Sequence, residues 1–219
     1  MNHSYAHPPE PFKMDDMSDQ IPRRNFLPGR LLGRTILSLF GWQIEGDLPQ
    51  LSKAIICVAP HTSNWDFVFG MAGALSRDLD ASWFGKHSLF RFRPVARILT
   101  WLGGIPVDRN LPHGIIEQVI QTCNSRKSFL FGLAPEGTRR RVTRWKTGIY
   151  HISRNTNVPI IPVCNNYPRR RIVVYESFQP DQDMEHAMLE ISRYYCAYQA
   201  KKPANFSPHI ADRSEPSSP

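Results

Sequence analysis

The chain has 219 residues, enough for one ordinary domain with a full hydrophobic core. Hydrophobic residues make up 41% and charged residues 21%, a globular composition that excludes bulk disorder, and no run of about 18 apolar residues exists to cross a membrane. The formal net charge of +8 predicts a surface that attracts anions, whether nucleic acid, anionic lipid or a phosphorylated substrate.

The two ends of the sequence differ from its middle. Residues 1–24 and 203–219 are rich in proline and lack helical or strand periodicity, so we predict two disordered tails around a single domain at 25–202. Residues 25–42 open that domain with an amphipathic helix pattern, in which Leu32 and Ile36 share a face away from Arg30 and Arg34. Such a helix either lies in a membrane interface or packs on the domain's own core.

Apolar runs of two lengths alternate through the rest of the chain. Predicted strands lie at 53–59, 81–85, 128–134, 158–163 and 171–176; predicted helices lie at 67–75, 89–102, 114–123, 148–157 and 183–199. Short apolar strands separated by helices predict an α/β domain with a mixed, mostly parallel sheet flanked by helices. The two prolines of 158–163 predict that this strand lies at a sheet edge or a bulge.

Cysteines are few and widely spaced. They lie in apolar or helical stretches without a C-x-x-C pair, at Cys57, Cys123, Cys164 and Cys196. We expect four buried free thiols and therefore a reducing, cytoplasmic compartment.

The stretch "APHTSNWDFVFG" (59–70) holds a histidine and an aspartate five residues apart. A strand that ends at Pro60 delivers His61 to the edge of the sheet where α/β proteins bind ligands. If a helix begins near Trp65, Asp66 in its first turn can orient one ring nitrogen of His61 and leave the other as a general base. The alternative is a structural role, with His61 and Asp66 serving only the helix N-terminus. A metal site is weaker still, because no third ligand is near in sequence.

Two further stretches carry arginine beside glycine. "GGIPVDR" (103–109) ends in Arg109, whose planar guanidinium suits phosphate oxygens. "APEGTRRR" (134–141) follows a predicted strand and offers Glu136, the flexible backbone of Gly137, the Thr138 hydroxyl and Arg139. A solvated basic surface is the alternative for both stretches.

These blocks, in this order, resemble the glycerophospholipid acyltransferase family typified by 1-acylglycerol-3-phosphate acyltransferase. The resemblance rests on the H-x-x-x-x-D block, the glycine-led block that ends in arginine, E-G-T-R, and V-P-I-x-P-V at 158–163. It spans about residues 40–165. Pro60 and Pro106 depart from the family pattern, which often has asparagine and an aromatic residue at these two places.

The resemblance implies a role for each block. His61 would be the base that activates an acceptor hydroxyl for direct attack on an acyl thioester, and Asp66 would orient it. The phosphate of the acceptor would be bound by Arg109 and by the block from Glu136 to Arg139, that is Glu136, Gly137, Thr138 and Arg139. Lys86 lies where the family often has a lysine, which would hold an anionic group.

We therefore expect an O-acyltransferase that moves a fatty acyl group from acyl-CoA or acyl carrier protein to a lysophospholipid, above all 1-acylglycerol-3-phosphate, at a membrane surface. No cofactor, metal ion or nucleic acid is expected. Pro106 motivates a second acceptor, such as a lyso-aminolipid. A non-catalytic peripheral membrane or anion-binding protein is the remaining alternative.

Overall fold

The computed structural model describes residues 21–107 and 112–209, and in this part of the chain one seven-stranded sheet forms the centre. The strands are β1 (Gln43–Glu45), β2 (Lys53–Val58), β3 (Ala81–Lys86), β4 (Gly104–Val107), β5 (Phe129–Leu133), β6 (Ile160–Asn166) and β7 (Arg171–Val174). Their spatial order is β1-β7-β6-β2-β5-β3-β4. Every neighbouring pair is parallel except β6 with β7, which confirms the predicted mixed, mostly parallel sheet.

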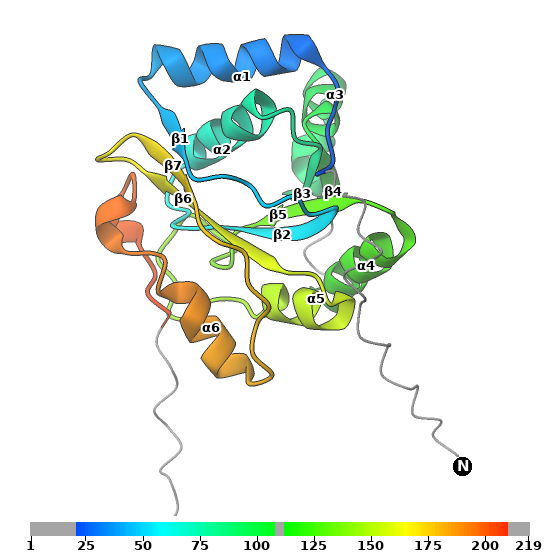
Figure 1. Ribbon diagram of the computed structural model, residues 1–219, viewed down its shortest axis with the longest axis vertical. Helices are drawn as coiled ribbons and strands as arrows, with labels where there is room; N and C mark the ends of the chain where they lie inside the picture. Colours follow the sequence, from blue (N-terminus) through cyan, green and yellow to red (C-terminus); the bar gives the residue numbers. More distant parts are fainter. Residues whose placement is uncertain (1–20, 108–111, 210–219) are drawn as a thin grey trace, which may run out of the picture.

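Helices cover both faces of the sheet (Figure 1). They are α1 (Leu27–Leu39), α2 (Asn64–Ser76), α3 (Arg93–Trp101), α4 (Pro112–Ser125), α5 (Gly148–Thr156) and α6 (Met184–Ser192). The first three lie on one side of the sheet and the last three on the other (Figure 1). Two buried clusters follow from this layering, one around Phe131 and Ile149 and one around Phe69 and Leu130.

Helix α1 packs closely along α2 because glycine faces the contact. A Cβ at Gly33 would lie 2.5 Å from the backbone nitrogen of Ser76 and 2.6 Å from the carbonyl oxygen of Ala72. The buried face of α1 is therefore narrow, made by Gly29, Gly33 and Leu37. One face of α1 packs against the domain, and the leucines on its other faces are exposed. Leu39 is the most exposed of them, with 77% of its surface accessible.

Strand β6 is not at an edge, so the edge alternative predicted from its prolines was wrong. It pairs with β2 on one side and β7 on the other. The carbonyl oxygen of Pro162 accepts from the Tyr175 backbone nitrogen, so the proline faces β7, and the β6–β7 ladder begins one residue later at Val163. The missing N–H of Pro162 thus falls between this ladder and the antiparallel bridge of Ile160 with Phe178, where the register shifts by one residue, which agrees with the bulge alternative.

The C-terminal helix ends earlier than predicted. Helix α6 stops at Ser192, and residues 197–199 form a separate 3-10 turn in which the Gln199 side chain caps the Cys196 backbone nitrogen. The break turns the Tyr195 hydroxyl toward the carbonyl oxygen of Cys57, 2.8 Å away. Cys196 is exposed, contrary to the prediction of four buried thiols, whereas the other three cysteines are buried.

The predicted tails are ordered at their inner ends. Ile21 is buried, and Arg23 forms a bridge with Leu79. At the other end Pro203–Asn205 form a 3-10 turn, and Ser207 is fully buried, accepting from the Trp145 indole at 2.7 Å. Single anchoring contacts of this kind leave no periodicity in a sequence. The inner ends of the two tails, predicted from proline content at residues 24 and 203, therefore differ from the structure.

Candidate active site

The end of β2 and the start of α2 hold the histidine and the aspartate. The strand ends at Val58, and Ser63 caps α2 by accepting from the Trp65 backbone nitrogen. Asp66 is the third residue of the helix and completes a reciprocal capping box with Ser63. The five-residue turn between β2 and α2, residues 59–63, is thereby fixed by the side chains of Ser63 and Asp66.

Asp66 is almost fully buried, and each of its oxygens has a partner. Oδ2 accepts from the backbone nitrogens of Thr62 at 2.6 Å and Ser63 at 2.7 Å. Oδ1 accepts from the Tyr167 hydroxyl at 2.6 Å. The aspartate therefore has the helix-capping role that was the structural alternative, and it also faces the histidine.

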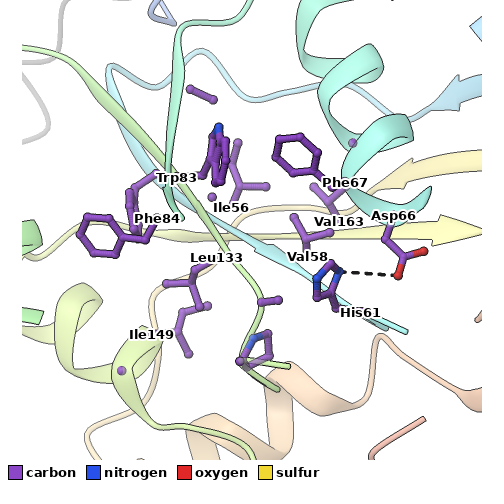
Figure 2. Close-up of a pocket in the computed structure, with 18 of the residues that line it drawn as sticks. Ile56, Val58, His61, Asp66, Phe67, Trp83, Phe84, Leu133, Ile149 and Val163 are labelled. Atoms are coloured by element: carbon purple, nitrogen blue, oxygen red, sulfur yellow. Dashed lines mark ion pairs between the residues drawn. The ribbon is translucent and has the colours of Figure 1, made fainter. Parts of the chain in front are cut away.

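His61 turns Nδ1 toward Asp66 Oδ2, with 3.6 Å between the two atoms (Figure 2). This distance exceeds a direct hydrogen bond, so Asp66 acts on the ring mainly through its charge. Burial lowers the pKa of His61 below its usual 6.5; Asp66 opposes this change and Arg139 adds to it. The ring is thus neutral at pH 7, and Nε2 is the nitrogen left to accept a proton.

A cavity of about 880 Å³ opens beside His61. Figure 2 shows its lining, which is largely apolar and comes from β2, α2, β3, β5, β6 and α5. Phe67, Gly70, Met71 and Ala74 line it along one face of α2. A Cβ built on Gly70 would meet no atom within 4 Å, so the cavity is open at that point. Such a volume suits a long apolar group whose polar end lies at His61.

Glu136 lies behind the histidine and is absent from the cavity lining. Its Oε1 accepts from the His61 backbone nitrogen at 2.8 Å, whereas Oε2 is buried and has no hydrogen-bond partner in the described part of the chain. Burial raises the pKa of Glu136 to about 7. The position of this carboxyl fits a residue that holds the backbone of His61 better than one that contacts a phosphate.

The rest of the E-G-T-R block does face the cavity. Gly137 adopts φ +64°, a conformation that favours glycine, and it lines the cavity with Thr138 and Arg139. Two more basic residues of the same loop join them, Arg144 and Lys146. This group, which we call the basic rim, is Arg139, Arg144 and Lys146.

Three other basic residues lie elsewhere. Arg140 and Arg141 are exposed and do not line the cavity, as expected for a solvated basic run. Lys86 is exposed at the end of β3, also outside the lining. Arg109 lies outside the described residues.

Sequence reasoning missed two residues that contact Asp66. Besides Tyr167, the Asn165 side-chain amide donates to the Asp66 backbone oxygen at 2.9 Å. Both are about a hundred residues from Asp66, so no spacing could reveal them. The available signal was topological: the carboxyl ends of neighbouring parallel strands meet, so the residues that end β6 lie beside those that end β2. Among the described residues no cluster of three metal-ligating side chains occurs.

Comparison with known proteins defines the class. The family model for Acyltransferase matches residues 42–166, which hold β2, α2, the E-G-T-R loop and most of the sheet. The chain therefore belongs to the Acyltransferase family, and it is an enzyme of that class.

Individual relatives agree with the family. The chain is 32% identical to the 1-acyl-sn-glycerol-3-phosphate acyltransferase of Escherichia coli K12 over 67% of its length, a match that spans 62% of that enzyme. It is 28% identical to the enzyme of the same name from Salmonella typhimurium, over 90% of this chain and 86% of the relative. The crystal structure of the 1-acyl-sn-glycerophosphate acyltransferase PlsC from Thermotoga maritima shares the fold, with a TM-score of 0.54, 16% identity, and coverage of 76% and 75% of the two chains.

Proposed function

We propose that this acyltransferase moves a fatty acyl group from an acyl thioester, acyl-CoA or acyl carrier protein, to the free hydroxyl of 1-acylglycerol-3-phosphate and so makes phosphatidate. The observation that carries the proposal is a neutral histidine paired with a buried carboxylate at the mouth of an apolar cavity with a basic rim. The named activity of the bacterial relatives agrees with it.

The proposed chemistry is a direct transfer. Nε2 of His61 accepts the proton of the acceptor hydroxyl while that oxygen bonds to the thioester carbonyl carbon. The carbon–sulfur bond then breaks, and the thiolate takes the proton from His61. Asp66 stabilises the imidazolium that exists between these two steps. The sequence has no G-x-S-x-G motif that would supply a serine nucleophile for an acyl-enzyme.

The two substrates divide the site between them. The apolar lining along α2 suits the acyl chain, because burying each methylene is worth about 0.8 kcal/mol. The basic rim suits the phosphate of the acceptor, since guanidinium groups bind phosphate oxygens in pairs of charge-assisted hydrogen bonds. Arg109 and Lys86 stay proposed contacts of the acceptor on the family resemblance alone.

The proposed function also needs a lipid surface, and α1 and α3 offer one. The ring of Phe26, just before α1, contacts Trp101 at the end of α3 in an edge-to-face pair, 5.8 Å between centroids. No residue of α3 is buried. The exposed apolar side chains of the two helices and of Phe92, the residue before α3, are here called the apolar face: Leu27, Leu31, Leu32, Leu39, Phe92, Val95, Ile98 and Trp101.

Charge on the same two helices favours an anionic bilayer as the partner of the apolar face. Arg34, Arg93 and Arg97 are exposed on α1 and α3, where they can reach lipid phosphates. In the described part of the chain no helix meets the length and hydropathy of a membrane span. On the strength of the apolar side chains and the neighbouring arginines, we propose peripheral binding, with the apolar face in the bilayer interface.

Vesicle sedimentation tests this binding. Purified protein should pellet with vesicles of phosphatidylcholine and phosphatidylglycerol, and the doubly substituted Leu31→Glu, Ile98→Glu protein should not. Tyr198→Glu is the matched control, because Tyr198 is an exposed apolar side chain outside the apolar face. Equal sedimentation of all three proteins would contradict the proposal.

An acyl-transfer assay tests the reaction itself. Wild type and His61→Ala are given labelled acyl-CoA with lysophosphatidate, and phosphatidate formation is followed; acyl carrier protein donors and a lyso-aminolipid acceptor are run in parallel. Product from wild type alone is the expected result. Full activity in His61→Ala would refute the mechanism, and preference for the lyso-aminolipid by orders of magnitude would replace the acceptor.

A further inference from the structure

The Asp66 carboxylate accepts one hydrogen bond from outside the β2–α2 turn. Among the described residues, Tyr167 is the side chain that donates it. It follows the end of β6 and donates its hydroxyl to Oδ1 at 2.6 Å, across 101 residues of sequence. The other two donors are backbone nitrogens of the turn itself. Removing the tyrosine hydroxyl therefore changes the environment of Asp66 without altering the turn.

The ring of Tyr167 is held on several sides. It meets Trp42 edge to face, 5.0 Å between centroids, and its backbone nitrogen donates to the Gln199 carbonyl oxygen at 3.0 Å. The Lys201 ammonium lies 5.4 Å above the ring. Burial, together with the bond to Asp66, raises the pKa of Tyr167 above its usual range, so the hydroxyl stays protonated and remains a donor at any working pH.

We propose that Tyr167 is a positioning residue of this acyltransferase, which fixes the Asp66 carboxylate and withdraws part of its negative charge so that His61 stays a neutral base. The inference rests on the proposed role of His61. A carboxylate that gives one lone pair to a strong donor attracts a neighbouring imidazolium less. Loss of the hydroxyl should therefore strengthen the pull of Asp66 on His61 and favour the protonated ring.

Other charged groups around His61 do not replace this effect. Arg139 opposes protonation of the ring, and Glu136 contacts its backbone nitrogen from the loop after β5. Lys201 lies over Tyr167, and burial raises the pKa of the Cys164 thiol on β6 to about 12, which keeps it neutral. None of these donates a hydrogen bond to Asp66 Oδ1, which Tyr167 alone reaches among the residues described.

The test compares Tyr167→Phe with Tyr195→Phe. Tyr195 is a matched control because its hydroxyl also donates one buried hydrogen bond near the end of β2, to the Cys57 carbonyl oxygen at 2.8 Å. It does not contact Asp66. The readout is the titration of His61 by nuclear magnetic resonance on protein labelled in the histidine ring, with His61→Gln to assign the signal. This titration needs no turnover, so it is independent of whether the proposed substrates are correct.

We expect the His61 midpoint to rise by about half a pH unit to one unit in Tyr167→Phe. It should stay in place in Tyr195→Phe, and in an Asp66→Asn background Tyr167→Phe should add nothing. The acidic limb of kcat/KM should move the same way as the midpoint. An unchanged or lowered midpoint in Tyr167→Phe, or equal movement in both tyrosine variants, would overturn the proposal. Absence of turnover in the wild type would instead refute the proposed function and leave the titration result standing.

Discussion

Two loops bring chemistry to the same edge of the sheet, and they are built in opposite ways. The turn between β2 and α2 holds Thr62, Ser63 and Asp66, all buried and joined by short hydrogen bonds. The loop after β5 begins with buried Glu136 but continues into Arg139 and its neighbours, which are exposed. One loop is rigid, and the other presents its charges to solvent.

The difference fits the two tasks that we propose for these loops. A general base must be aimed within a few tenths of an ångström, which requires locked neighbours. A receptor for a charged headgroup must exchange ligands, and long arginine side chains can close on a phosphate after it arrives. Substitutions of the buried polar side chains in the rigid turn should therefore cost both rate and stability, whereas those of the exposed basic side chains in the other loop should change substrate binding alone.

Asp66→Asn should have the largest effect. An amide presents the wrong group to one of its donors and removes the charge that stabilises imidazolium. We expect kcat to fall by about 10³ to 10⁴, and the free energy of unfolding to fall by about 1 to 3 kcal/mol. His61→Ala should lose as much rate with a stability change under about 1 kcal/mol, because within the described residues the ring forms a single ion pair, the 3.6 Å contact with Asp66. Urea unfolding and initial rates measure both, and equal stability of the two variants would contradict the account.

Glu136→Gln should reveal a pH-dependent stability. The pKa of Glu136 is about 7 in the folded protein against a usual value of 4.5, so the folded state holds a proton that the unfolded state releases between these values. The free energy of unfolding should therefore fall as pH rises from 4.5 to 7, by about 3 kcal/mol at most, and then level off. Glutamine cannot ionise, so the variant should lack this fall. Parallel stability curves for the two proteins between pH 4.5 and 8 would contradict the prediction.

Arg139→Ala should change binding of the acceptor. Hydrogen bonds to charged groups contribute about 1.5 to 3 kcal/mol, so the KM for the phosphorylated acceptor should rise about tenfold or more. The KM for the acyl donor and the free energy of unfolding should stay close to wild type. Arg140→Ala is the matched control, since Arg140 is exposed beside Arg139 and does not line the cavity. A rise of KM in both variants would indicate a diffuse electrostatic effect in place of a specific contact.

Substitutions at Gly70 should have a small effect on stability and a specific effect on substrate choice. Its Cβ position is open, so Gly70→Ala should stabilise α2 by about 0.5 to 1 kcal/mol. Gly70→Leu should fill the cavity and shift the preferred donor toward shorter acyl chains in a competition assay of mixed acyl-CoAs. Val68→Leu, on the exposed side of α2, controls for the helix itself. An unchanged chain profile in Gly70→Leu would show that the acyl chain does not lie along α2.

Much of this molecule could be predicted from local sequence because its strands are short, apolar and separated by helices. The strand before His61 and the helix around Asp66 were predicted from a β-branched run followed by capping residues. The same two features stabilise these elements in the structure. The strand Gln43–Glu45 was missed, since three residues with mixed burial carry no period. The predicted helix to Gln199 failed because a tertiary contact of Tyr195 outweighs its helical spacing.

The site was predictable only where its residues are neighbours in sequence. His61 and Asp66 share one turn, and Thr138 with Arg139 follows one strand. Tyr167 reaches Asp66 because β6 lies beside β2 in the sheet, and no local sequence pattern encodes that strand order. Glu136 shows the opposite limit: its place in the motif suggested a ligand contact, but the structure turns it inward to the His61 backbone.

The pH dependence of kcat/KM for wild-type acyl transfer, measured beside the residual activity of His61→Ala, tests most directly whether neutral His61 is the base. Because burial lowers the pKa of His61, we expect a single acidic limb with its midpoint below 6.5, absent from His61→Ala. A midpoint at or above 6.5, or the same limb in His61→Ala, would contradict it.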